Sequence, residues 1–121
     1  MSGSERLRAA LATKDRDAFV AALAPDVVWS GHEQLANAGQ QCRSREQVAA
    51  VFDFQIAAGR TGEPEIVGDS GDAVVVDPHP QPPVPGFETI HHVYVLKDGL
   101  VVRMQDYPDR ASALAAVGME P

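Results

Sequence analysis

A hairpin near the end of the chain constrains the fold more than any other segment. Residues 88–109 contain two long runs of β-branched and aromatic residues, joined by the dipeptide Asp98-Gly99. An Asp-Gly pair between such runs is typical of a type I′ turn, in which both central residues need a positive φ. The segment therefore predicts two long antiparallel strands. They run into a short helix over 111–117, with Asp109 as its N-cap and Gly118 as its end.

The first half of the chain has helical periodicity instead. Apolar residues form a stripe between Ser4 and Leu23, with Asp15 as a plausible second N-cap that breaks the helix. Pro25 ends this region, and a short strand is expected at 27–29. The polar segment 31–43 predicts a loop. Residues 44–47 form a capping box for a second helix that ends at Gly59.

After residue 64 the pattern changes to strands, at 65–67 and 72–77, with a turn at 68–71. Five of the nine prolines follow between Pro78 and Gly86, which predicts a stiff polyproline-like connection. A Pro-rich ligand for another domain is the alternative. Helices followed by an antiparallel meander predict an α+β fold, and we expect one domain over residues 1–121.

The composition argues against some classes of binding partner. Ten basic and seventeen acidic residues give a net charge of −7, which argues against nucleic acid or an anionic membrane as a partner. Cys42 is the only cysteine, so no intrachain disulfide is possible. No signal-peptide pattern or apolar run of membrane-spanning length occurs, and we expect a cytoplasmic protein.

The run Gly-Leu-Val-Val-Arg-Met-Gln-Asp-Tyr-Pro-Asp over 99–109 resembles the closing strand of the nuclear transport factor 2-like superfamily. SnoaL-type cyclases, ketosteroid isomerases and limonene epoxide hydrolases belong there. The resemblance implies a cone-shaped, curved antiparallel sheet wrapped by N-terminal helices, also described as a cystatin-like roll. It also implies a hydrophobic pocket on the concave face and a homodimer through the convex face.

Strand alternation assigns faces to the last strand. It places Val102, Met104 and Asp106 on one face and Val101, with Arg103, Gln105 and Tyr107, on the other. In the resembling epoxide hydrolases the acid at the position of Asp106 points inward and handles protons. Burial in an apolar pocket makes a carboxylate a usable general acid or base. The alternative is a structural carboxylate bonded to backbone amides.

Other candidates follow from the same resemblance. His91 and His92 are adjacent on a strand and face opposite ways; the alignment favours His92 and Tyr94 inward, beside Asp106. A partly exposed histidine is the alternative. Asp77 and His79 stand where the epoxide hydrolases hold an Arg-x-Asp pair, although the arginine is missing. His32 is the nearest replacement for the base of the ketosteroid isomerases. Apolar pocket walls are expected from Phe19, Trp29, Phe52, Phe54 and Met104.

Neither metal-ligand spacing nor a Gly-rich phosphate loop occurs, so no metal or cofactor is expected. Two hypotheses remain. The chain is a cofactor-free isomerase, dehydratase or other lyase, or cyclase, with Asp106 and His92 as acid and base on a small apolar or aromatic molecule. Alternatively, it is a non-catalytic ligand-binding or dimeric interaction domain of the same fold. The two hypotheses are distinguished by whether Asp106 and an inward histidine lie within hydrogen-bond distance in an open cavity.

Overall fold

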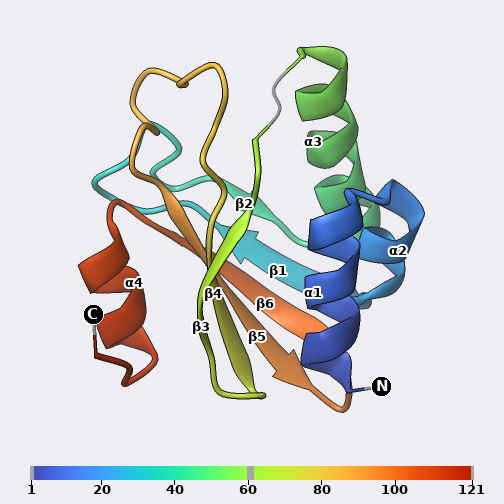
Figure 1. Ribbon diagram of the computed structural model, residues 1–121. Coiled ribbons are helices and arrows are strands. Elements are labelled where there is room, and N and C mark those ends of the chain that lie inside the picture. The colour runs from blue at the N-terminus through green and yellow to red at the C-terminus, as the bar shows by residue number, and fades with distance from the viewer. Residues whose placement is uncertain (1, 60–61, 121) are drawn as a thin grey trace.

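The computed structural model describes residues 2–59 and 62–120, which form four helices and one six-stranded sheet. In chain order the elements are α1 (Gly3–Thr13), α2 (Arg16–Ala21), β1 (Leu23–Ser30), β2 (Gln41–Cys42), α3 (Arg45–Ala57), β3 (Glu65–Asp69), β4 (Ala73–Asp77), β5 (His91–Lys97), β6 (Leu100–Tyr107) and α4 (Arg110–Ala116). The strand order is β2-β1-β6-β5-β4-β3. Helices α1 to α3 lie on one side of the sheet and α4 on the other (Figure 1).

The expected helix boundaries are largely confirmed by their caps. The Asp15 carboxylate accepts hydrogen bonds from the backbone N–H groups of Asp17 and Ala18, which starts α2 after a break. Asp109 accepts from the N–H of Ser112 at 2.7 Å and starts α4. At both positions an acidic N-cap satisfies orphan backbone donors, so local sequence alone determines where the helix begins.

Three local expectations needed correction. Ser44 accepts from the Gln47 N–H as a capping box requires, but the Gln47 side chain reaches the backbone N–H of Arg43. The first strand is longer than predicted because its pairing with β6 extends it. The expected loop at 31–43 contains the short strand β2, which pairs with the end of β1.

The β5–β6 hairpin has the predicted turn and an unpredicted bulge. Asp98 and Gly99 have φ values of 54° and 82°, as a type I′ turn requires. The register pairs Val95 with Arg103 but Leu96 with Val101, so Val102 is an extra residue. The bulge reverses the expected faces: Val101 is fully buried with the inner core, and Val102 is not part of that core.

The expected α+β cone is confirmed, with a sheet that is mixed rather than wholly antiparallel. Strand β1 runs parallel to β6, whereas the other neighbouring strands are antiparallel. Periodicity within β1 carries no information on this direction, because alternation is the same in both kinds of sheet.

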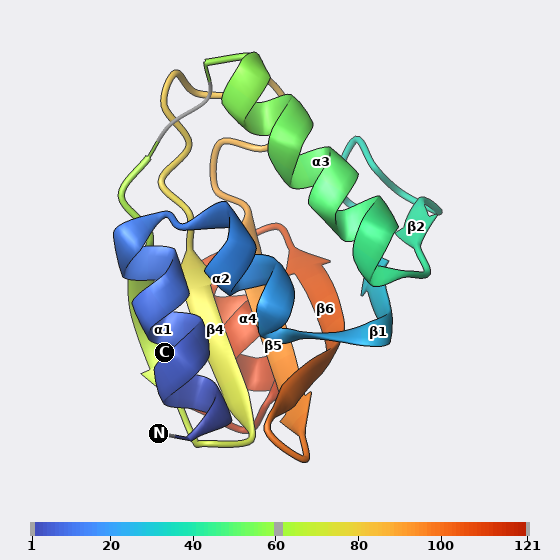
Figure 2. The ribbon, with the colours of Figure 1, turned by 90° about the vertical axis from the view of Figure 1, so that its right-hand side faces the viewer.

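Two cores lie on opposite faces of the sheet. The larger one fills the concave face beneath α1, α2 and α3 (Figure 2). On the outer face, Val75 and Val93 pack against Ala113 and Leu114 of α4. The convex face, through which a homodimer is expected, is therefore partly covered: Val93 is buried beneath α4, and Val101 faces the other way. None of the described helices has the length and apolarity needed to cross a membrane.

Candidate functional site

Two adjacent rows of side chains cross the concave face. Paired residues on neighbouring strands point to the same side of a sheet, so register decides which groups meet. Val76 pairs with His92, and His92 with Asp106. In the next row Trp29 pairs with Met104, and Met104 with Tyr94. Segments of β1, β4, β5 and β6 thus bring together residues that lie far apart in the sequence.

These rows line a cavity of about 490 Å³ between the sheet and the helices. Its polar members include His92, Tyr94 and Asp106. The expected wall residues that line it are Phe19, Trp29, Phe52 and Met104. The outer rim is formed by the C-terminal end of α3, residues 62 and 64, and the Pro-rich segment after β4. The end of α3 and the Pro-rich segment lie at the same end of the molecule (Figure 2). Its size suits a small organic molecule.

Asp106 is the buried polar centre of this cavity. Its side chain is 1% exposed, and within the described part of the chain its carboxylate contacts three side-chain partners. Trp29 Nε1 donates to Oδ1 at 2.7 Å, and His92 Nδ1 lies 2.7 Å from the same oxygen. Asn37 Nδ2 donates to Oδ2 at 2.8 Å. The alternative of a strand-end carboxylate bonded to backbone amides does not describe this group.

The imidazole of His92 is held between aromatic rings. Its centroid lies 5.7 Å from that of Trp29 and 6.3 Å from that of Tyr94, both in edge-on arrangements. When the neutral imidazole donates from Nδ1 to the Asp106 carboxylate, Nε2 keeps its lone pair. Nε2 makes no hydrogen bond to any part of the chain that the structure describes. The side chain is 16% exposed, so it is reachable from the cavity.

Tyr94 adds a second polar group. Burial, and to a smaller extent the nearby negative charge of Asp106, raise the pKa of the Tyr94 phenol. The hydroxyl therefore stays protonated at all physiological pH values. Its ring also packs edge-on against Phe19 at 6.4 Å. The cavity thus offers a permanent hydrogen-bond donor near the Asp106–His92 pair.

Sequence reasoning missed Asn37. This residue lies in the β1–β2 loop, where no periodicity assigns a face, and it meets Asp106 across 69 positions of sequence. Its own Oδ1 accepts from the backbone N–H of His32. Gln105 supports the same loop from the outer face by donating to the carbonyl of Gly31 at 2.9 Å. The only signal in the sequence was that Asn is common in structured turns.

Four expected pocket residues lie elsewhere. Asp77 follows the inward-facing Val76 and so points to the outer face, and His79 bonds to Glu65 Oε1 at 2.8 Å on that side. His32 lies against the Tyr107 ring, 5.5 Å between centroids, and does not line the cavity. Phe54 is 62% exposed on a different face of α3 from Phe52.

Asp77 belongs to a charged cluster on the outer face. Burial raises the pKa of Asp77, but the His79 backbone N–H, the charge of His91 and the hydrogen bond from Arg110 outweigh it and lower the pKa overall. Ligand atoms of Glu65, Asp77 and His79 lie within 4.8 Å of one another, a grouping that could hold a cation. Arg110 Nη2 already contacts both acids, at 3.4 Å and 3.1 Å. Through these contacts Arg110 links the start of α4 to β3 and β4.

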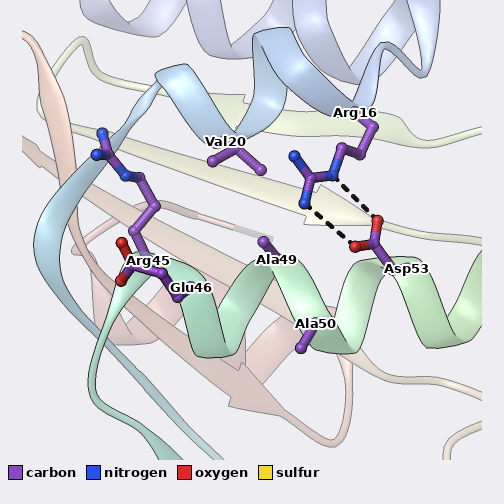
Figure 3. Close-up of a pocket in the computed structure, with 7 residues that line it drawn as sticks. All are labelled: Arg16, Val20, Arg45, Glu46, Ala49, Ala50 and Asp53. Carbon is purple, nitrogen blue, oxygen red and sulfur yellow. Dashed lines mark hydrogen bonds and ion pairs between the residues drawn. The ribbon is translucent and has the colours of Figure 1, made fainter.

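A second, shallow depression lies between α2 and α3 (Figure 3). Arg16 donates to both oxygens of Asp53, at 3.0 Å and 3.1 Å, and Arg45 lies at the opposite end. Between them lie the small apolar side chains of Val20 and Ala49. The Arg16–Asp53 pair is exposed and serves to align the two helices.

The comparisons with known proteins decide the family. The model for the SnoaL-like domain matches residues 4–104. The chain belongs to the SnoaL-like family. None of the curated proteins matches it. The matched span of this SnoaL-like protein ends just before Asp106, so the buried acid and α4 lie outside the match.

Solved structures agree on the fold. A nuclear transport factor 2-like protein from Burkholderia thailandensis is 21% identical, with a TM-score of 0.62, and the match covers 100% of this chain and 99% of that one. A candidate polyketide cyclase from Sinorhizobium meliloti is 20% identical, with a TM-score of 0.58, over 87% and 93%. An LEH-like epoxide hydrolase from Mycobacterium tuberculosis is 24% identical, with a TM-score of 0.53, over 87% and 78%.

Proposed function

We propose that this SnoaL-like protein is a cofactor-free isomerase, lyase or cyclase that moves protons on a small, largely apolar molecule. The observation that carries the proposal is the contact of 2.7 Å between Asp106 and His92 at the lining of an open apolar cavity. Buried acid–histidine pairs of this kind are suited to general acid–base chemistry. The epoxide hydrolase and candidate cyclase among the similar structures are consistent with small-molecule chemistry on this fold.

Each polar group has a separate role in the proposal. His92 Nε2 takes a proton from the ligand, and Asp106 stabilises the imidazolium that forms. Trp29 and Asn37 hold the carboxylate in place and do not touch the ligand's reacting atoms. Tyr94, kept protonated, donates a hydrogen bond to an oxygen on which negative charge develops. His92 then returns the proton to the same molecule or to a leaving group.

One observation favours the second candidate, a ligand-binding protein without turnover. Asp106 already accepts three hydrogen bonds from its own chain, so the carboxylate is satisfied in the absence of a ligand. A carboxylate with these three hydrogen bonds can stabilise the fold and hold His92 in place without taking part in a reaction. In that case the cavity holds the same class of molecule, and Tyr94 with His92 Nε2 only recognises its polar group.

Proton transfer can be tested before the natural substrate is known. In D₂O, an active base exchanges acidic C–H protons of bound ketones for deuterium, which mass spectrometry detects. We expect exchange with the wild-type protein and at least tenfold less with His92→Gln, a variant of similar size. Phe54→Ala, on the exposed face of α3, is the matched control. Binding without exchange in the wild type contradicts the enzymatic proposal and supports the binding protein.

We further propose a homodimer through the outer sheet face that α4 leaves open. Val28 of β1 pairs with Arg103 of β6, and Ser30 with Gln105, so these four side chains share that face. Arg103 is exposed and Val28 only partly buried. A mixed face of this kind is suited to a twofold contact in which the same patch is used by both copies.

A further inference from the structure

The charged groups of the cavity are separated by its length. Asp106 lies at the inner end, 1% exposed, and Lys14 at the outer rim, with a side chain 43% exposed. Among the lining residues that the structure describes, Lys14 is the only lysine or arginine and Asp106 the only acid. The surface between them is mainly apolar and is made by Leu11, Phe19, Val48, Phe52, Val76 and Met104.

Lys14 holds this rim position in an unusual backbone conformation. It ends α1 with φ 56° and ψ 31°, in the left-handed region that glycine or asparagine normally occupies at a helix end. Its Nζ lies 2.8 Å from Glu63 Oε1, and the Glu63 side chain is 87% exposed. Exposed ion pairs of this kind are weak, so Glu63 is a poor competitor for an anion that also fills the apolar cavity.

We propose that the cavity binds an amphipathic carboxylic acid, with its carboxylate on Lys14 and its apolar body directed toward His92 and Asp106. The inference rests on the proposed function, because it takes the cavity as the ligand site. The orientation follows from charge. A carboxylate at the inner end would meet the negative charge of Asp106 in a poorly screened environment, whereas at the rim it meets the only described lysine or arginine of the lining.

Two probes of equal chain length separate the carboxylate from the apolar body: octanoate and 2-octanone. Binding is followed by the fluorescence of Trp29, which is the only tryptophan of the chain and lines the cavity. We expect octanoate to bind more tightly than 2-octanone. In Lys14→Asn the octanoate affinity should fall about fivefold, the scale of one partly exposed ion pair, while 2-octanone affinity stays unchanged.

Asparagine is chosen because it tolerates the left-handed conformation, and circular dichroism checks that the variant is folded. Lys97→Asn is the matched control, since Lys97 is the only other lysine and lies at the end of β5 beside the hairpin turn. It should leave both affinities unchanged. Glu63→Gln removes the competitor and should strengthen octanoate binding by about twofold, independently of any effect of Lys14→Asn on folding.

The outcomes distinguish the two proposals. Equal loss for both probes in Lys14→Asn, or no loss for octanoate, overturns the role of Lys14 and leaves the cavity as a ligand site. Unchanged octanoate affinity in Glu63→Gln also counts against it. No binding of either probe to the wild type, checked by calorimetry, overturns the cavity site and with it both proposals.

Discussion

Asn37 donates its side-chain amide to Oδ2 of Asp106 at 2.8 Å and so ties the β1–β2 loop to the inner end of the cavity. Removing the amide leaves one oxygen of a buried carboxylate without its donor. We expect Asn37→Ala to lower the free energy of unfolding by about 1–3 kcal/mol, measured by urea denaturation. Gln34→Ala, an exposed change in the same loop, should cost less than about 0.5 kcal/mol. Equal stabilities for the two variants would contradict this.

Asp106→Asn keeps the size of the side chain but replaces an acceptor by a donor. Oδ1 receives Trp29 and His92, and Oδ2 receives Asn37, so the new amide NH₂ meets a donor at either position. We expect a folded protein that is less stable by about 1–3 kcal/mol and that has lost deuterium exchange. Retained exchange would show that His92 does not need Asp106.

Trp29 combines packing with a hydrogen bond, and two variants separate these contributions. Trp29→Phe removes the indole N–H that reaches Asp106 but keeps a ring, and should cost about 1 kcal/mol. Trp29→Ala also leaves a void next to the inner core, and about 3 kcal/mol is expected. Thermal unfolding measures both. An unchanged midpoint for Trp29→Ala would show that the side chain does not support the core.

The charged cluster around Asp77 on the outer face should make the free energy of unfolding fall more steeply at acid pH than it would without this carboxylate. Because the pKa of folded Asp77 lies below its ordinary value of 3.8, its carboxylate stabilises the fold above that value. The contribution is lost as the pH falls through the lowered folded pKa. As the pH falls below about 4, Asp77→Asn should therefore show a flatter fall in unfolding free energy than wild type. Asp72→Asn, on the exposed β3–β4 turn, should follow the wild-type profile.

The proposed dimer is tested on the outer face. We expect light scattering to give the mass of two chains at micromolar concentration for the wild type. In Val28→Lys, which sets a new charge beside Arg103 in each copy, the mass should shift toward one chain. A wild-type mass of one chain would contradict the dimer.

Local chemistry predicted much of this molecule. Asp15 and Asp109 start helices because a short acidic side chain satisfies backbone donors wherever it stands, and Asp98-Gly99 forms its turn for equally local reasons. Alternation, together with the family resemblance, also placed His92 and Asp106 on one face. That these two residues pair directly across the hairpin follows from the strand register, which the turn fixes.

What the sequence did not predict depends on register or on loops. Val101 was assigned to the wrong face because a bulge is invisible to simple alternation. Asp77 was expected in the pocket through an alignment to a motif that the chain only partly contains, although its neighbour Val76 faces inward. Asn37 lies in a segment without periodicity, so no pattern in the sequence relates it to Asp106.

The extra residue in β6 also bears on the curvature of the sheet. A bulge bends its strand and increases the local twist, and a more bent sheet encloses more space beneath the helices. Deleting Val102 would pair Val95 with Arg103 and Leu96 with Val101 in continuous register, with every side chain still on its present face. The composition of the lining would be preserved while the sheet flattened. If the cavity is the ligand site, as proposed, its volume should then depend on backbone length at one position while every lining residue stays the same.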